Sequence, residues 1–281
     1  MLFIASCISA HGELNITFTP LDYPSAITTV PFGVSGNTIV GSYRDASGDH
    51  GFIYTGSFSK LDYTQDGISY PTVPQGINGS TIVGAFFDGT LYHGFIYDIT
   101  AGTFDMPFDY PGAVGGTSIN AVSGGSVVGT YSDGTEHGFY WDGTSAPVEI
   151  DYQLATDTFL FGILGSKIAG SYLYNGSYHG LYIDGKGFQT LDYDSNFNNS
   201  LTGISGKYTL GYYCDATFTH CTGFLYDGQF TIFGYPSAQS TVPLSLSGNT
   251  IVGVHSDGIG PEHGFIATIK QNHPKPKPHR S

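Results

Sequence analysis

The sequence predicts an all-β fold, a six-bladed β-propeller with four strands in each blade. Three observations lead to this prediction. A five-residue word, His-Gly-Phe-Ile-Tyr, recurs six times with a period of 41–44 residues. Each period holds four short apolar runs separated by Gly, Asn, Asp and Ser, and no stretch has helical spacing long enough to compete. A repeat of about 40–45 residues with four strands is typical of a propeller blade.

Three words mark each repeat. The first begins at His50, His93, His137, His179, Thr222 and His263. The second, Leu-Asp-Tyr-Pro or a relative, has its aspartate at Asp22, Asp62, Asp109, Asp151 and Asp192 and decays to Gly-Tyr-Pro at Gly234. The third, Ile-Val-Gly-x-Tyr, lies near Val40, Val83, Val128, Ala169, Leu210 and Val252.

The four runs of the first full unit are rich in Val, Ile, Tyr and Phe, the residues that favour strands. They are Thr29–Val34, Thr38–Tyr43, Gly51–Tyr54 and Phe58–Tyr63. The same segmentation predicts blades at Pro24–Tyr63, Thr64–Tyr110, Pro111–Tyr152, Gln153–Tyr193, Asp194–Tyr235 and Pro236–Ile269.

The last unit lacks a fourth strand, and the missing strand is found at the other end of the chain. Its own strands are Val242–Leu246, Thr250–Val254 and His263–Ile269, after which the pattern stops. We expect Ile16–Tyr23 to pair beside His263–Ile269, because this closes the ring and removes an exposed sheet edge. The single propeller domain would then cover residues 13–269.

This register pairs each histidine with the aspartate that follows in its own blade. The pairs are His50 with Asp62, His93 with Asp109, His137 with Asp151, His179 with Asp192 and, around the closure, His263 with Asp22. The one blade that has lost its histidine, at Thr222, has also lost its aspartate, at Gly234. We expect a structural hydrogen bond between imidazole and carboxylate, because neither group is stable when buried without a partner.

Composition restricts the partners. The net charge is −14 and only 11% of residues are charged, which argues against nucleic acid because an acidic chain repels phosphates. The 21 Tyr, 20 Phe and 41 Gly suit a twisted sheet with tight turns and large side chains between blades. The weakly charged polar surface is common in secreted proteins, and we expect a monomer without a transmembrane segment.

The cysteines indicate the same compartment. Cys214 and Cys221 flank one loop and can bridge it, which implies an oxidising environment. The alternative is two free thiols or a weak metal pair with His220, which would not complete a tetrahedral site.

Both ends of the chain are predicted to lie outside the propeller. Residues 1–12 have the character of a leader remnant. Ile4-Ala5-Ser6-Cys7 resembles a lipoprotein processing box that would put a lipid anchor on Cys7, and Ser9-Ala10 equally suits ordinary cleavage. Residues 270–281 alternate Pro with Lys and indicate a disordered tail.

The combined words, H-G-F-[IL]-Y-D-G-x-F-x-x-L-D-Y-P and G-[IV]-x-G-x-x-[IV]-G-x-Y, resemble the HAF family of extracellular repeats of secreted bacterial proteins. The resemblance covers residues 16–269. It implies secretion and a β-rich repeat fold, and it brings no catalytic residues with it. The chain departs from the pattern at Thr222, Gly234 and the cysteine-bearing loop.

Residues that break the repeat on the face around the central channel are the better functional candidates, since repeated residues solve a repeated packing problem. The expected channel-mouth residues are Thr29, Tyr70, Thr117, Asp157, Asn199 and Thr241. Asp157 is the only carboxylate among them and is the candidate catalytic acid or base, although a turn hydrogen bond explains it as well.

Farther from the axis we expect Arg44, Asp66, Tyr92, Tyr174, Asn196, His220 and Glu262. Exposed tyrosines beside amides and carboxylates suit sugars, which stack on flat apolar rings and hydrogen bond through hydroxyls, and core aromatics reaching the surface would give the same pattern.

No metal site is predicted, because the five histidines lie far from one another. Loops at Asp133 and Asp257 hint at Ca²⁺ but lack the alternating acids of a calcium loop. No nucleophile elbow, phosphate loop or zinc-protease motif is present. Three functions stay open: an extracellular binding module for a glycan or a protein, a glycan-active hydrolase or lyase, and a structural envelope or matrix protein.

Overall fold

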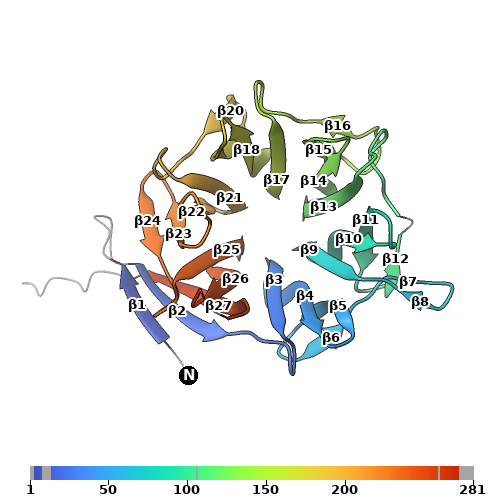
Figure 1. Cartoon of the computed structure of the whole chain (residues 1–281), viewed down its shortest axis with the longest axis horizontal. Coiled ribbons are helices and arrows are strands. Elements are labelled where there is room, and N and C mark those ends of the chain that lie inside the picture. The colour runs from blue at the N-terminus through green and yellow to red at the C-terminus, as the bar shows by residue number, and fades with distance from the viewer. Residues whose placement is uncertain (1–2, 8–13, 106, 259, 272–281) are drawn as a thin grey trace, which may run out of the picture.

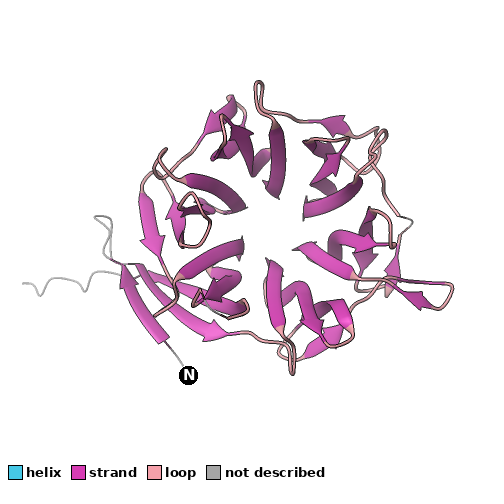
Figure 2. Cartoon of the chain, viewed as in Figure 1, coloured by secondary structure: helices cyan, strands magenta, loops and turns pink. Residues whose placement is uncertain are grey.

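A computed structural model describes residues 3–7, 14–105, 107–258 and 260–271. Six antiparallel sheets stand around a central axis as the blades of a propeller (Figure 1). The described residues contain strands, turns and loops and no helix (Figure 2). The predicted fold class is therefore confirmed.

The blades have these strands. Blade 1 holds β3 (Thr28–Ser35), β4 (Thr38–Asp45), β5 (Gly48–Tyr54) and β6 (Phe58–Lys60). Blade 2 holds β9 (Thr72–Asn78), β10 (Thr81–Phe87), β11 (Tyr92–Asp98) and β12 (Thr103–Phe104). Blade 3 holds β13 (Gly116–Ser123), β14 (Ser126–Ser132), β15 (Glu136–Trp141) and β16 (Val148–Glu149). Blade 4 holds β17 (Asp157–Leu164), β18 (Lys167–Tyr174), β19 (Ser177–Asp184) and β20 (Gly187–Thr190). Blade 5 holds β21 (Asn198–Ser205), β22 (Tyr208–Cys214), β23 (Cys221–Tyr226) and β24 (Phe230–Phe233). Blade 6 holds β25 (Ser240–Ser247), β26 (Thr250–Ser256), β27 (His263–Gln271) and β2 (Leu14–Pro20).

The N-terminal strand closes the ring as the sequence predicts. In the antiparallel ladder between β2 and β27, Ile16 lies opposite Ile269 and Pro20 opposite Phe265. The strand ends at Pro20, three residues before the predicted end at Tyr23, because the chain then crosses to blade 1. Ile16 and Phe18 are fully buried, so closure also completes the apolar packing of blade 6.

The structure adds one strand outside the predicted domain. Phe3–Cys7 forms β1, which pairs with β2 so that Cys7 lies opposite Leu14. The candidate lipid-bearing residue Cys7 is therefore part of the outermost strand of a five-stranded sheet. At the other end, β27 extends through Gln271. The remainder of the predicted leader and tail lies outside the described residues.

A short hairpin not expected from the sequence connects blades 1 and 2. Its strands are β7 (Thr64–Gln65) and β8 (Ile68–Ser69), and it projects from the rim of the disc (Figure 1). Asp66 and Gly67 both have positive φ, 52° and 78°, as a type I′ turn requires. Asp66, a predicted binding residue, is thus a turn residue on the rim.

The glycine of the His-Gly-Phe word is needed because backbone from the next segment passes very close to it. A Cβ on Gly180 would lie 2.3 Å from the carbonyl oxygen of Leu191, and one on Gly51 would lie 2.3 Å from that of Leu61. The amide groups of these leucines donate to the same two glycines, Leu191 to Gly180 and Leu61 to Gly51, at 2.9 Å. The Leu-Asp-Tyr word is therefore held against the third strand at this point.

Candidate ligand pocket at the channel mouth

Each histidine of the repeat lies against the aspartate with which the sequence pairs it. The distances from Nδ1 to the carboxylate are 2.8 Å for His50–Asp62, 2.8 Å for His93–Asp109, 2.5 Å for His137–Asp151, 2.8 Å for His179–Asp192 and 3.3 Å for His263–Asp22. The aspartates lie just beyond the fourth strand, where the chain crosses to the next blade.

In most blades the carboxylate has a second donor. Asp62, Asp151, Asp192 and Asp22 also accept the backbone N–H of the glycine after the histidine. The exception is Asp109, because Gly94 donates instead to the carbonyl of Phe108 at 3.0 Å. These are structural bonds that fix the crossing segment to the blade it has just left.

A second carboxylate, missed in the sequence, faces the other nitrogen of three histidines. Nε2 lies 3.1 Å from Asp133 for His137, 3.2 Å from Asp88 for His93 and 3.6 Å from Asp45 for His50. The signal was present, since each aspartate stands two residues after the aromatic residue that ends the Ile-Val-Gly word.

The two carboxylates determine the protonation of the ring. Burial disfavours the charged form of His93 and His137, but hydrogen bonds to Asp109 and Asp88, and to Asp151 and Asp133, outweigh it and raise the pKa of both imidazoles.

The tyrosine of the Leu-Asp-Tyr word binds the blade that follows. Its ring stacks on an aromatic residue of the second strand, at 3.6 Å between centroids for Tyr23–Tyr43 and 3.9 Å for Tyr152–Tyr172. Its backbone N–H donates to a side-chain oxygen at the start of the inner strand, as from Tyr152 to Thr158 at 3.2 Å. One word therefore joins two blades, with the aspartate on the earlier and the tyrosine on the later one.

This bond is made by four of the predicted binding residues. Thr29, Thr117, Asn199 and Thr241 are at most 2% exposed and accept the tyrosine N–H at 2.9–3.0 Å. Their side-chain oxygens are thus engaged in bonds within the protein, although Asn199 also lines the pocket described below. Tyr70 likewise packs against the buried cluster of Tyr63 and Phe86.

Asp157 stands one position earlier in the repeat, as the first residue of the inner strand β17 at this end of the channel (Figure 1). Its Oδ1 accepts the backbone N–H of Glu136 at 3.0 Å. The equivalent residue of blade 5, Asn198, accepts the N–H of Tyr178 at 3.0 Å in the same way. Asp157 thus makes an inter-blade hydrogen bond that the side-chain amide of Asn198 also makes in the neighbouring blade.

A pocket of about 350 Å³ opens between blades 4 and 5 at this end of the channel. Most of its wall is aromatic. The lining residues are Phe159, Phe161, Ser171, Tyr178, Asn198, Asn199, Ser200, Tyr212 and Phe218. The ring centroids are 6.1 Å apart for Phe159 and Phe161, 6.2 Å for Phe159 and Tyr178, and 5.9 Å for Tyr178 and Phe218.

Three of these rings break the repeat. At the position of Phe159 the other blades carry Val30, Val73, Ser118, Ser200 and Val242. At the position of Tyr212 they carry Ser42, Ala85, Thr130, Ser171 and Val254. The third, Phe218, stands on the disulfide-bearing loop. In blades 4 and 5, which are neighbours, large aromatic side chains therefore replace smaller ones. An alignment of the six repeats would have shown these replacements from the sequence.

The pocket wall also contains hydroxyl groups. Burial raises the pKa of the Tyr212 phenol, and the neighbouring Ser200 side chain partly offsets that effect. No Lys, Arg, Asp or Glu is among the lining residues. The site is therefore neutral, apolar on its faces and polar at a few points.

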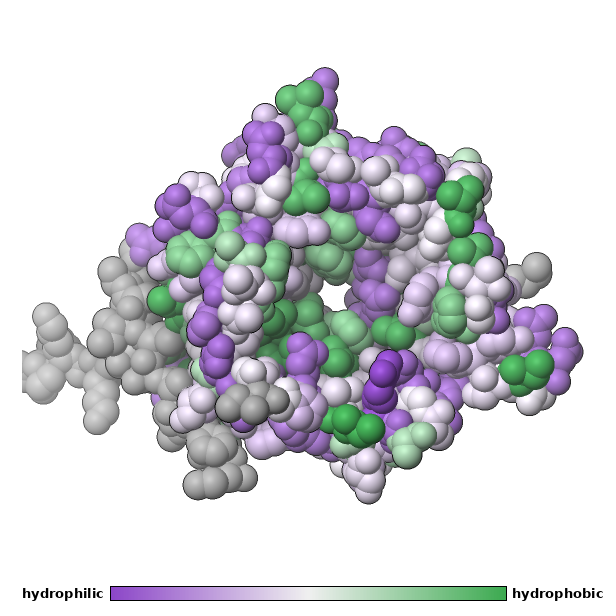
Figure 3. Space-filling model, viewed as in Figure 1, coloured by the Kyte–Doolittle hydropathy of each residue, from purple (hydrophilic) through white to green (hydrophobic). Residues whose placement is uncertain are grey.

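The pocket continues into the channel, where Phe161 and Tyr212 also line a space of about 200 Å³ with Phe32, Gln75, Asn120, Thr202 and Leu244. In the space-filling view the channel is open through the disc, and apolar side chains gather on one side of its mouth (Figure 3).

The remaining predicted residues do not line the pocket. Arg44 forms a bidentate ion pair with Asp49 at 2.6 and 2.7 Å, and Asn196 donates to Asp194. His220 contacts Asp215 of the same loop, at 2.8 Å from its Nδ1 to the carboxylate. Tyr92 and Tyr174 are 48% and 38% exposed, and Glu262 is also exposed.

Among the described residues one trio could approach a metal ion, His137, Glu149 and Asp151. Its oxygens already accept hydrogen bonds from protein donors, including the Tyr131 hydroxyl on Glu149 at 2.5 Å. The candidate calcium loops are closed by their own turns, in which Asp133 accepts from Thr135 and Asp257 from Gly260.

The disulfide between Cys214 and Cys221 joins β22 to β23. No helix in the described part of the chain has the length and apolar character to cross a membrane.

No model of a protein family and no curated protein matches the chain. Solved structures do. The β-propeller domain of the Trilobed protease from Pyrococcus furiosus is 10% identical, with a TM-score of 0.60 over 99% of this chain and 95% of that one. Acylaminoacyl peptidase of Pyrococcus horikoshii gives a TM-score of 0.56 at 10% identity over 96% of this chain and half of that one. A catalytically inactive virginiamycin B lyase from Staphylococcus aureus gives 0.52 at 11% identity over 90% and 99%. At such identities the similarity shows the β-propeller fold alone.

Proposed function

We propose that this protein is an extracellular binding module that holds a sugar ring of a glycan in the pocket between blades 4 and 5. The observation that carries the proposal is the gathering of Phe159, Tyr212 and Phe218, three breaks in an otherwise regular repeat, around one cavity. Repeated residues build the disc, so an irregular cluster of large rings needs another explanation.

The chemistry of the wall fits a neutral ring. The faces of Phe159, Tyr178 and Phe218 offer the flat apolar surfaces on which the C–H faces of sugars pack. The hydroxyls of Ser171, Ser200 and Tyr212 supply hydrogen-bonding groups for sugar hydroxyls. The volume of about 350 Å³ suits one or two sugar units at the end of a longer chain.

Two observations support the extracellular location. A disulfide forms and persists in oxidising compartments, and the resemblance to HAF repeats supports the same location.

A glycan array followed by titration calorimetry tests the proposal. Phe218→Ala should lower the affinity for the best-binding glycan about tenfold or more. The reason is that an aromatic contact contributes about 0.5–1.5 kcal/mol beyond the contribution of its buried area. Phe188→Ala is the matched control, since Phe188 is equally exposed, at 46%, but lies on β20 outside the pocket. Absence of glycan binding, or equal binding by both variants, would remove the proposal and favour a structural role in an envelope or matrix.

One observation favours a second candidate, a glycan-active hydrolase or lyase. Burial, and then the nearby charge of Asp157, raise the pKa of the Glu136 carboxyl, although a hydrogen bond with Ser132 opposes them. A carboxyl with a raised pKa is suited to act as a general acid. Asp157→Asn keeps the bond to Glu136, as Asn198 shows, so loss of polysaccharide cleavage in this variant would assign catalysis, and unchanged cleavage would exclude Asp157 from it.

A further inference from the structure

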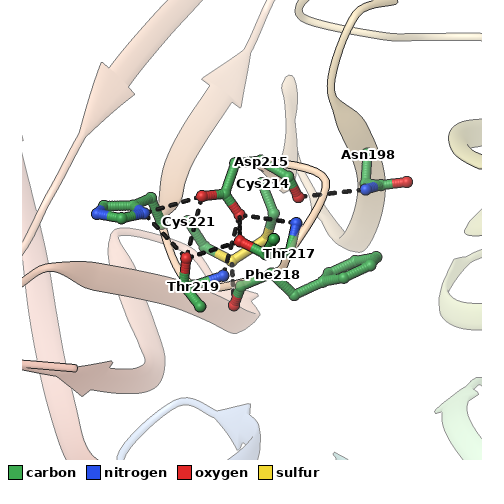
Figure 4. Close-up of a disulfide and its surroundings, with 8 residues drawn as sticks. Asn198, Cys214, Asp215, Thr217, Phe218, Thr219 and Cys221 are labelled. Atoms are coloured by element: carbon green, nitrogen blue, oxygen red, sulfur yellow. Dashed lines mark hydrogen bonds and ion pairs between the residues drawn. A yellow bond between two sulfur atoms is a disulfide. The ribbon is translucent and has the colours of Figure 1, made fainter. Parts of the chain in front are cut away.

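The loop between Cys214 and Cys221 carries Phe218, whereas the other four aromatic rings among the described lining residues lie on strands. Phe218 sits at the tip of this loop and is 49% exposed, with the ring pointing away from the disulfide (Figure 4). Its φ is +58°, in the left-handed region that bulky residues rarely adopt. Such a conformation persists only where the surrounding structure imposes it.

Asp215 imposes it from one end of the loop. Its carboxylate accepts the backbone N–H groups of Thr217 and Thr219 at 3.2 and 3.0 Å. The same carboxylate accepts both threonine hydroxyls and lies 2.8 Å from Nδ1 of His220. Although desolvation opposes it, these bonds hold the pKa of Asp215 well below its usual value, so the carboxylate stays charged.

The backbone closes the same turn. Phe218 N–H donates to the carbonyl of Asp215, and Asp215 N–H donates to the carbonyl of His220, both at 3.1 Å. Asn198 of the pocket wall donates from Nδ2 to the Asp215 carbonyl at 3.3 Å. The loop is therefore tied to the wall that it faces (Figure 4).

The disulfide fixes both ends. Cys214 and Cys221 are directly opposite in the ladder of β22 and β23 and are at most 6% exposed. In blades 1–3 the corresponding loop is held by the aspartate–histidine contact, and in blade 5 the histidine is replaced by Thr222. In blade 5 the loop aspartate, Asp215, contacts His220 instead, and the disulfide adds a covalent constraint to the same loop.

We propose that the disulfide and Asp215 are positioning residues for ligand selection, because they hold Phe218 in a conformation that forms the outer wall of the sugar pocket. This rests on the proposed function. Reduction by a dithiol would transfer two electrons and two protons to the S–S bond, leaving two cysteine thiols and an oxidised, cyclic reductant. The freed loop would let Phe218 leave the left-handed region, so affinity and selectivity would fall.

The test uses a panel of p-nitrophenyl glycosides as probes, with the glucoside, galactoside, mannoside and N-acetylglucosaminide compared by their Kd values. The double variant with Cys214→Ala and Cys221→Ala should bind the best probe about tenfold more weakly. The Kd values of the four glycosides should also become more similar to one another. Hydrogen exchange at the amides of Phe218 and Thr219 should accelerate at least tenfold, which is measured without any ligand.

Asp215→Asn is the second variant, since it keeps the disulfide and one acceptor oxygen. A smaller fall in affinity and a partial acceleration of exchange are expected. If the cysteine variant keeps full affinity and selectivity while Phe218→Ala loses binding, the pocket stands and the positioning role is refuted. If Phe218→Ala also binds normally, the pocket itself is refuted and this inference with it.

Discussion

Replacing His137 by Ala measures how strongly the repeated histidine holds the crossing segment to its own blade. Its Nδ1 contacts Asp151 at 2.5 Å, and the two side chains are 20% and 29% exposed. A hydrogen bond to a charged group contributes about 1.5–3 kcal/mol, and this exposure favours the lower end. The outer contact with Asp133, which is 52% exposed, adds between about 0 and 1 kcal/mol.

Removal of the ring does not leave Asp151 without a partner, because it still accepts the N–H of Gly138 at 3.1 Å. We therefore expect His137→Ala to lower the free energy of unfolding by about 2 kcal/mol, measured by urea denaturation. Thr222→Ala is the matched control, because blade 5 carries threonine where the others carry histidine. It should cost less than about 0.5 kcal/mol.

The difference between wild type and His137→Ala should also depend on pH. Because the folded protein raises the pKa of His137, the protonated form is stabilised by folding. That contribution is fully present below the unfolded value of about 6.5 and is lost as pH rises through the folded pKa. The destabilisation should thus be larger at pH 5.5 than at pH 8.5. An effect no larger than that of Thr222→Ala, or one that grows with pH, would refute the reasoning.

Two further predictions concern the junctions between blades. Gly180→Ala should lower the free energy of unfolding by about 1–3 kcal/mol or more, since its Cβ would lie 2.3 Å from the Leu191 oxygen. Gly185→Ala, where no atom lies within 4 Å, should be neutral, and equal effects in urea denaturation would contradict the close approach. Thr158→Val should cost about 1–3 kcal/mol, because Tyr152 N–H loses its acceptor in a site that is 1% exposed. Thr158→Ser should restore most of that stability in the same assay, and a Val variant as stable as the Ser variant would argue against the bond.

The fold and its closure could be predicted because the same four-strand pattern recurs six times along the chain. A weak preference for a strand at Thr38–Tyr43 becomes convincing when the same pattern returns at a constant spacing. The histidine–aspartate pairs followed from the register, as both words recur and both fail together at Thr222 and Gly234.

The channel mouth could not be located to the residue. Side chains alternate between the two faces of a strand, so an assignment shifted by one position moves each candidate to the wrong face. Choosing Thr29, Thr117 and Thr241 instead of the residues before them selected side chains that point into the blade. Asp157 was assigned without this shift, and it makes an inter-blade bond that the sequence did not indicate.

The pocket was missed for another reason. No single blade reveals it, since Phe159, Tyr212 and Phe218 come from three strands or loops of two blades. Each looks like one more aromatic residue in a chain with 20 Phe and 21 Tyr. Only their place in the repeat, compared blade by blade, separates them from the aromatic residues that pack the core.

Blade 5 combines the lost histidine–aspartate pair with the gained disulfide, and the energies explain how it can do so. Loss of the pair removes about 2 kcal/mol by the reasoning for His137. A disulfide that closes a short loop contributes about 2.5 kcal/mol in the chain-entropy account. The exchange is nearly neutral for stability, but its geometry differs. The imidazole ties a blade to the segment that follows it, whereas the bond between Cys214 and Cys221 ties the two strands that carry the Phe218 loop. The substitution therefore moves the constraint from the crossing between blades to the wall of the pocket, which is where a binding protein needs rigidity.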